Sequence, residues 1–133
     1  MSYPEIVLPR LKNELDINNA SFIAVVRDPV KRACSHYQHL VRARGLTETF
    51  KTVAEIDINS RSKRCPATWT NVITDGLYGV HLEKWFDAVG NNLKVVLYES
   101  LCEDHLNSIH SIFKFLDLPP QAETDLLLSL IHI

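Results

Sequence analysis

Glycine is scarce in this sequence. The 133 residues include four glycines, at positions 45, 76, 79 and 90. A phosphate-binding loop needs glycines and a lysine between a strand and a helix, because its backbone N–H groups must approach the phosphate closely. None of the four glycines lies in such a pattern. The sequence therefore contains no phosphate-loop motif.

Long apolar runs, an excess of basic charge and a complete set of cysteine pairs are also missing. No apolar run is long enough to span a bilayer, and no signal peptide is visible at the first residue. The formal net charge of −2 argues against a general nucleic-acid-binding protein, which needs a basic surface. Cys34, Cys65 and Cys102 fit no zinc-site spacing, and an odd number cannot pair completely. We expect Cys34 to be a small core residue.

Apolar residues and local positive charge are what the chain does have. Its length and its apolar content suit one domain with a core. A cluster of basic residues comprises Arg27, Lys31, Arg32, Arg42, Arg44, Lys51, Arg61, Lys63 and Arg64. Such a cluster on a mildly acidic chain suits an anionic small molecule or a sulfated glycan. For Arg42, Arg44 and Lys51 taken singly, a solvated helix face is the preferred interpretation.

A strand followed by a helix is predicted in the first third of the chain. The apolar run Phe22–Val26 indicates a buried strand. A helix is predicted over Pro29–Arg44, since Asp28 suits its N-cap and proline is favoured at the first helical position. Gly45 is expected to end this helix.

The turn between this strand and this helix suits a phosphate. In nucleotide-binding α/β units, ligands lie beyond the carboxyl ends of the strands. Arg27 lies at that edge, and Ser35 lies roughly 9 Å along the helix axis from Pro29. A guanidinium and a hydroxyl so placed could hold one phosphate between them. The alternative is a helix cap with an ion pair between Asp28 and Arg32.

The rest of the chain predicts further helices and a second strand. Helices are expected over 9–15, over 47–56 with Thr47 as cap, and over 76–89, 104–116 and 122–131. A strand over 93–98, placed parallel to the first, makes the fold class α/β, with a parallel sheet flanked by helices. A polar loop over 59–75 contains Trp69, which either anchors the loop or stacks on a ligand.

Three histidines are candidates for a polar site. His81 borders the apolar face of the predicted helix 76–89 and has the chemistry of a general base. It is equally suited to packing or hydrogen bonding, and we do not assign it as catalytic. His36 and His39 flank Ser35 and could contribute to a polar pocket, although exposed positions on the helix are the favoured interpretation. The apolar face itself is formed by Tyr78, Leu82, Trp85, Phe86 and Val89.

Several segments together resemble the sulfotransferases that use 3′-phosphoadenosine 5′-phosphosulfate (PAPS). Three parts of this chain resemble the family's 3′-phosphate-binding motif: Val26-Arg27-Asp28-Pro29, Arg32 and Ser35-His36-Tyr37. The Arg-Asp-Pro variant is similar to the carbohydrate-sulfating branch, which includes heparan sulfate enzymes and bacterial relatives. Further similar segments are Gly76-Leu77-Tyr78, His81-Leu82, Trp85, Val95-Val96-Leu97-Tyr98-Glu99-Ser100-Leu101 and Ile112-Phe113-Lys114-Phe115-Leu116-Asp117-Leu118-Pro119. The resemblance covers about residues 3–120.

The resemblance implies a fold, a reaction and two site residues. The fold is the P-loop-NTPase-like fold of sulfotransferases. The reaction is transfer of a sulfuryl group from PAPS, by in-line attack, to a hydroxyl or amine of a carbohydrate acceptor. Arg27 and Ser35 take the positions of the residues that bind the nucleotide's 3′-phosphate. The expected partners are PAPS and the acceptor, with no metal and no nucleic acid.

The chain departs from the family in its N-terminal part. The family's phosphate loop and catalytic base have no match, so the catalytic residues stay unknown. We therefore expect residues 1–133 to be a partial sulfotransferase domain that carries the 3′-phosphate-binding half. A fragment, an incomplete gene model or a degenerate member, each with little activity alone, would have these features. The location is expected to be the Golgi lumen for a eukaryotic member whose anchor is missing here, or the cytoplasm for a bacterial one.

Two other functions remain open. The chain could be a catalytically inactive module that binds a nucleotide or a sulfated glycan on the same fold. It could also be a relative of P-loop kinases in which Arg27 clamps a phosphate. The kinase interpretation suffers from the same missing loop, and the sequence offers no acidic magnesium site.

Overall fold

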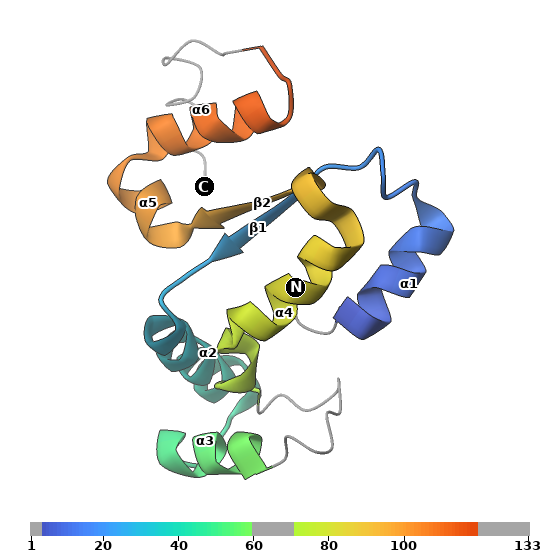
Figure 1. The fold of residues 1–133 in the computed structure, drawn as a ribbon. Helices are drawn as coiled ribbons and strands as arrows, with labels where there is room; N and C mark the ends of the chain where they lie inside the picture. Colours follow the sequence, from blue (N-terminus) through green and yellow to red (C-terminus); the bar gives the residue numbers. More distant parts are fainter. Residues whose placement is uncertain (1–3, 60–70, 120–133) are drawn as a thin grey trace.

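A computed structural model describes residues 4–59 and 71–119 of the chain. Two strands and several helices alternate along these residues (Figure 1). The elements are α1 (Pro4–Glu14), β1 (Phe22–Val26), α2 (Pro29–Arg44), α3 (Phe50–Asn59), α4 (Tyr78–Val89), β2 (Leu93–Leu97), α5 (Tyr98–Glu103) and α6 (His105–Phe115), with short 3₁₀ turns η1 (Thr74–Gly76) and η2 (Gly90–Asn92). The predictions for Cys65, for Trp69 and for a helix over 122–131 lie outside the described residues.

The two strands form a parallel pair, as the sequence predicted. Phe22 lies opposite Leu93, and Val26 lies opposite Leu97. Figure 1 shows α1 and α4 on one side of the strands and α6 on the other, so the fold is α/β with a flanked parallel sheet. Because the residues of the two strands pair one to one along their whole length, the carboxyl ends of both strands lie side by side.

The main core lies between the strands, α1 and α4. Its buried members are Ile17, Ala24, Trp85, Val89 and Leu93. The rings of Phe22 and Trp85 pack with their centroids 5.6 Å apart. The predicted apolar face of α4 is wrong at one position, because Phe86 is 45% exposed and His81 is buried. At 100° per residue, His81 lies on the Trp85 side of the helix and Phe86 does not.

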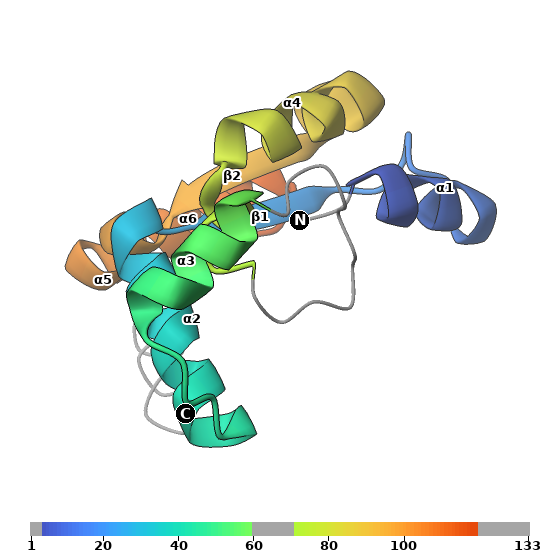
Figure 2. The same ribbon diagram turned by 90° about the horizontal axis from the view of Figure 1, so that it is seen from below.

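A second cluster joins α2 to α3. Leu40, Val53 and Val72 are buried there, with Tyr37 among the side chains packed around them. The Tyr37 ring meets Phe50 edge to face, at 5.4 Å between centroids. Both views show α2 and α3 beyond the carboxyl end of β1, and α2 lies next to the N-terminal end of α4 (Figures 1 and 2). The two helices therefore form an arm at the edge where the phosphate site is predicted.

The local signals around α2 are confirmed. The side chain of Asp28 caps the helix by accepting a hydrogen bond of 2.7 Å from the Lys31 N–H. Gly45 follows the last turn with a φ of 66°, and its N–H bonds to the Leu40 carbonyl. A side chain at this left-handed position would be strained, which is why glycine ends the helix here.

Three predicted boundaries are wrong. Helix α1 begins at Pro4 rather than Pro9, because Pro9 removes only one hydrogen bond while Val7, Leu8 and Leu11 pack against the main core. The cap of α3 is Thr49, whose hydroxyl accepts from the Thr52 N–H at 3.3 Å, and not Thr47. Tyr98 opens helix α5 instead of ending strand β2.

The structure also corrects two further predictions, the burial of Cys34 on α2 and the first residue of α4. Cys34 is exposed, because the buried stripe of α2 runs through its neighbour Ala33 and through Leu40, seven residues later. Helix α4 begins at Tyr78, and the preceding residues form η1 rather than a first α-helical turn. Helix α6 agrees with the prediction within a residue, since Asp104 is its N-cap.

The core packing generates a stability prediction. Trp85→Ala should lower the free energy of unfolding by about 3–5 kcal/mol, because it removes a buried ring from the main core. Phe86→Ala is the matched control on the same helix and should change it by less than about 0.5 kcal/mol. Urea denaturation followed by circular dichroism measures both. Equal losses in the two variants would contradict this account of the core.

Candidate functional site

The carboxyl ends of β1 and β2 bring Arg27 next to Tyr98 and Glu99. The Arg27 guanidinium carbon lies 5.0 Å from the centroid of the Tyr98 ring. The backbone N–H of Asp28 donates a hydrogen bond of 3.0 Å to Glu99 Oε1. The residues that follow the two strands are therefore joined directly. A cation over an aromatic face is held by about 0.5–1 kcal/mol at a site open to water, so Tyr98 restricts where the Arg27 head can lie.

Glu99 contributes a negative charge at the carboxyl end of the strands. The hydrogen bond from the Asp28 N–H is the largest cause that holds the pKa of Glu99 below its ordinary value, and nearby Lys31 and Arg27 act in the same direction. Glu99 is therefore a carboxylate near neutral pH. Its charge offsets part of the positive charge of the cluster, and its hydrogen bond keeps α5 against the start of α2.

Ser35 lies on the outer surface of α2. Ser35 follows Lys31 by four positions, so helical geometry places both side chains on the same side of the helix. Both are exposed, and no described residue hydrogen-bonds the Ser35 hydroxyl. Arg27 and Ser35 make no direct contact with each other within the described residues. A group that bound both would have to bridge the first two turns of α2.

Arg32 does not pair with Asp28. Its Nη2 donates a hydrogen bond to the backbone carbonyl of Val72 instead. A methyl group built on Gly76 would lie 3.5 Å from Arg32 Nε, so the glycine backbone packs directly against the guanidinium. Arg32 thus connects α2 to the chain that leads into α4, which the sequence did not indicate.

Residues 72–74 are held by side chains from three helices. Asp57 of α3 accepts hydrogen bonds from the N–H groups of Ile73 at 2.6 Å and Thr74 at 2.9 Å, and from the Thr74 hydroxyl at 2.7 Å. On α4, His81 Nε2 lies 3.2 Å from the Thr74 carbonyl oxygen. Together with the Arg32 bond, these contacts form what we call the 72–74 clasp. Its effect is to fix the position of α4 relative to α2.

Asp57 is the residue that sequence analysis missed. It is only 3% exposed, although it is a carboxylate. The available signal was its spacing, since Asp57 follows the buried Val53 by four residues and so falls on the inner face of α3. An acidic residue at a core position is expected to have hydrogen-bonding partners.

A cavity of about 250 Å³ lies between the end of β1 and the first turns of α2 and α4. It is lined by Val25, Val26, Arg27, Arg32, Asp75, Tyr78, His81 and Leu82. It unites Arg27 and His81, two residues that the sequence singled out separately. We call it the Arg27 cavity.

The other two histidines lie outside this cavity. The exposed position favoured for His36 is wrong, because this side chain is half-buried on α2. Burial is the main cause that lowers the pKa of His36, followed by the charge of Arg32. His39 is exposed, as the sequence favoured. Neither makes a hydrogen bond that would mark a catalytic arrangement within the described residues.

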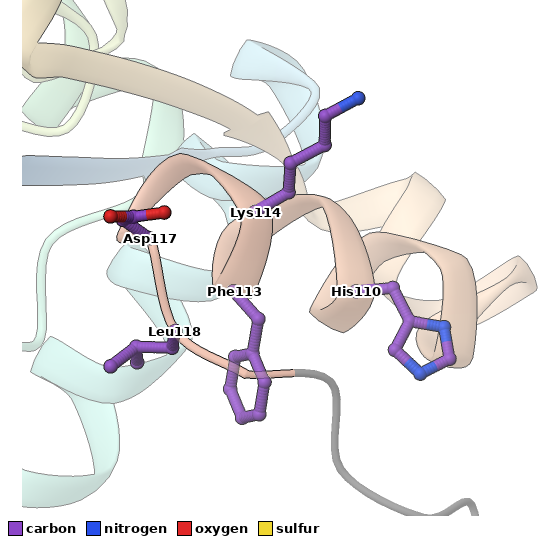
Figure 3. Close-up of a pocket in the computed structure, with 5 residues that line it drawn as sticks. All are labelled: His110, Phe113, Lys114, Asp117 and Leu118. Atoms are coloured by element: carbon purple, nitrogen blue, oxygen red, sulfur yellow. The ribbon is translucent and has the colours of Figure 1, made fainter.

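A second cavity, of about 350 Å³, lies far from Arg27. His110, Phe113, Lys114, Asp117 and Leu118 line it at the end of α6 (Figure 3). The Lys94 ammonium lies 5.7 Å from the Phe115 ring centroid, which places the end of α6 at the amino end of β2. This cavity is therefore at the opposite end of the strands from Arg27.

Neither a metal site nor a membrane-spanning helix occurs in the part of the chain that the structure describes. Residues 4–59 and 71–119 contain no group of histidine, cysteine and acidic side chains suited to hold a metal ion. Within those ranges, no helix has the length and apolar character needed to cross a membrane.

Comparison with known proteins points to one family. A family model described as "Sulfotransferase domain" matches residues 4–131. The crystal structure of a sulfotransferase from Alicyclobacillus acidocaldarius is similar, with a TM-score of 0.69 and 25% sequence identity. The match covers 86% of this chain and 45% of that one, so the chain spans less than half the length of this relative. No curated protein matches the sequence significantly.

The 72–74 clasp generates a second stability prediction. Asp57→Asn should lower the free energy of unfolding by about 1–3 kcal/mol, because a neutral amide oxygen is a weaker acceptor than a carboxylate for the two backbone N–H groups, and the amide nitrogen cannot accept from the Thr74 hydroxyl. Asp87→Asn, on the exposed face of α4, is the control and should be nearly neutral. Chemical denaturation of both variants measures the difference. If Asp57→Asn were as stable as the control, the clasp would not hold the helices.

The Glu99 contact generates a pH prediction. Because the pKa of Glu99 is lowered in the folded state, its contribution to stability is present above the ordinary carboxyl pKa and is lost as the pH falls through the lowered value. Glu99→Gln should therefore lower Tm at about pH 7 and have little effect at about pH 3. Glu103→Gln on the same helix is the control. A Tm difference that does not change with pH would contradict the contact.

Proposed function

The chain belongs to the sulfotransferase domain family, and on that premise we propose that its Arg27 edge binds the 3′-phosphate of PAPS. The Arg27 head and the Ser35 hydroxyl are the proposed ligands. The reaction served by this site is transfer of the sulfuryl group to a hydroxyl or amine of a carbohydrate. The family match and the bacterial structural relative support sulfuryl transfer in general, while the nucleotide and the acceptor are parts of the proposal.

The position of Arg27 is the observation that carries this proposal. It directly follows β1 at the carboxyl edge, where α/β folds place their ligands. The Tyr98 ring lies against its guanidinium, and none of its charge is consumed by an ion pair with a described carboxylate. A guanidinium presents a planar fork of donors that matches two phosphate oxygens at once.

Side chains, rather than the end of helix α2, would supply the anion contacts. Pro29 has no N–H group, and the Lys31 N–H is already bonded to Asp28. The helix terminus therefore has few free donors to offer. Lys31 and Ser35 are exposed on the same side of α2, where one adds charge and the other a hydroxyl donor. This arrangement favours an oxyanion lying along α2 next to Arg27.

In the proposed reaction the chain's own residues position the nucleotide. PAPS supplies the sulfuryl group: its sulfur forms a new bond to the acceptor oxygen or nitrogen while the bond from sulfur to the 5′-phosphate oxygen breaks. Adenosine 3′,5′-bisphosphate leaves, and the acceptor loses a proton. Arg27 and Ser35 hold the 3′ end, which reduces the freedom of the nucleotide before attack. No residue of this chain is assigned as the base.

A carbohydrate acceptor is supported by two features of the sequence. The Arg-Asp-Pro order at 27–29 resembles the carbohydrate-sulfating branch of the family. The basic residues near Arg27, including Lys31 and Arg32, suit an acidic glycan on a chain with a net charge of −2. A second candidate function is binding of a nucleotide or a sulfated glycan without chemistry, through the same Arg27 edge and its basic residues.

Binding of adenosine 3′,5′-bisphosphate tests the proposed site. Arg27→Ala should weaken binding by about tenfold or more, since hydrogen bonds to charged groups contribute about 1.5–3 kcal/mol. Ser35→Ala should weaken it by roughly fivefold, for about 1 kcal/mol. Arg42→Ala removes an exposed cation from the far end of the same helix and is the control. Isothermal titration calorimetry measures all four proteins.

Two results would contradict the proposal. One is the absence of binding by a folded wild-type chain. The other is an equal loss of affinity in Arg27→Ala and Arg42→Ala, which would indicate attraction by general positive charge. Adding PAPS and a carbohydrate acceptor to the same chain distinguishes the candidate functions, because sulfated product forms only if the chain is catalytic.

A further inference from the structure

Several residues that line the Arg27 cavity carry unpaired polar atoms. Among the described residues, four buried side-chain nitrogens have no hydrogen-bond partner: Arg27 Nε, Arg32 Nε, His81 Nδ1 and His105 Nε2. Three of these four belong to residues that line the Arg27 cavity. Leaving buried polar atoms unpaired costs free energy, so their concentration around one cavity is unusual for a purely structural space.

The hydrogen bond to Thr74 determines which ring nitrogen of His81 can accept a hydrogen bond from a ligand. A backbone carbonyl can only accept, so the proton lies on His81 Nε2. In the neutral imidazole the other nitrogen, Nδ1, is then an acceptor. His81 is only 6% exposed, so bulk water does not satisfy this nitrogen. His81 also lines the Arg27 cavity, so a ligand in that cavity lies next to this residue.

The unpaired atoms are of opposite kinds. The two arginine Nε–H groups are donors, and His81 Nδ1 is an acceptor. A fully deprotonated oxyanion could satisfy the arginines but has no hydrogen for the imidazole. A hydroxyl group can do both, because it accepts through its oxygen and donates its hydrogen. The polar groups of the cavity therefore match a hydroxyl better than an anion alone.

We propose that the Arg27 cavity receives the ribose hydroxyl that neighbours the 3′-phosphate, and that His81 is a specificity-determining residue for it. This inference rests on the proposed function. Arg27 connects the two sites, since it is the proposed phosphate ligand and also lines the cavity. The 2′-hydroxyl is on the ring carbon next to the phosphate, accepts from Arg27 Nε–H and donates to His81 Nδ1.

Entry of the hydroxyl requires a small change in the cavity walls. The unpaired nitrogens have almost no surface open to water, so the Arg27 side chain has to turn for the hydroxyl to reach them. The volume of about 250 Å³ leaves room for part of a ribose ring against the apolar walls. Leu82 and Val25 are among those walls.

A pair of nucleotides tests this inference on the unmodified chain. Adenosine 3′,5′-bisphosphate and 2′-deoxyadenosine 3′,5′-bisphosphate differ only in the hydroxyl in question. We expect the deoxy nucleotide to bind at least about tenfold more weakly, because it leaves polar groups of the site unpaired. Isothermal titration calorimetry of both nucleotides with the wild-type chain measures the ratio of dissociation constants.

Two substitutions of His81 separate its bond to Thr74 from its contact with the ligand. His81→Gln places an amide near the position of Nε2 and can keep a donor to the Thr74 carbonyl, but it has no atom equivalent to Nδ1. His81→Asn places its amide near the position of Nδ1 and cannot reach Thr74. In a folded His81→Gln chain, we expect the ratio of the two dissociation constants to fall by about fivefold, because the hydroxyl keeps its bond from Arg27 and loses the acceptor for its hydrogen. His81→Asn, whose amide oxygen can accept from the hydroxyl, should retain more of the discrimination than His81→Gln.

The outcomes distinguish this inference from the proposed function. If the wild-type chain binds both nucleotides equally, the inference is wrong and the 3′-phosphate site stands; a sugar acceptor's hydroxyl in the cavity would give this result. If His81→Gln weakens both nucleotides by the same factor, His81 acts through the structure alone and the inference is wrong. If neither nucleotide binds, both proposals fail. The wild-type comparison holds even if the variants do not fold.

Discussion

The parallel pairing of β1 with β2 is the constraint on which the rest of the structure depends. Because Val26 lies opposite Leu97, the residues that follow the two strands emerge side by side. Arg27 then meets the Tyr98 ring, and the Asp28 N–H meets the Glu99 carboxylate. A shift of one strand by one residue would separate these pairs and would turn the buried side chains of the shifted strand toward solvent. The candidate site is therefore a consequence of the strand register.

The 72–74 clasp holds helices α2 and α4 together at the same edge of the sheet. Three polar side chains, one from each of α2, α3 and α4, bond to a segment of three residues. Their hydrogen bonds satisfy backbone groups that would otherwise be buried without partners. The clasp places α4 beside the start of α2, which creates the Arg27 cavity between them. Packing alone would leave the relative position of these helices less well defined.

The elements that the sequence predicts correctly are determined by residues close together in the chain. The strand Phe22–Val26, the Asp28 cap and the Gly45 stop depend on neighbouring residues, and all three are confirmed. The resemblance also led to the right family. By contrast, the clasp carboxylate Asp57 and the Arg27–Tyr98 contact join residues distant in the chain, which periodicity does not report. The apolar run continues through Tyr98 and so predicts a strand there, although helix α5 begins at this residue.

Phosphorus NMR of adenosine 3′,5′-bisphosphate tests the central claim most directly, because its two phosphates give separate resonances. The claim is that this chain binds the nucleotide through its 3′-phosphate. On titration with the chain, the 3′ resonance should shift or broaden clearly more than the 5′ resonance, and Arg27→Lys should remove most of that difference because lysine lacks the planar fork of donors. Changes confined to the 5′ resonance, or equal changes at both that Arg27→Lys leaves intact, would contradict it.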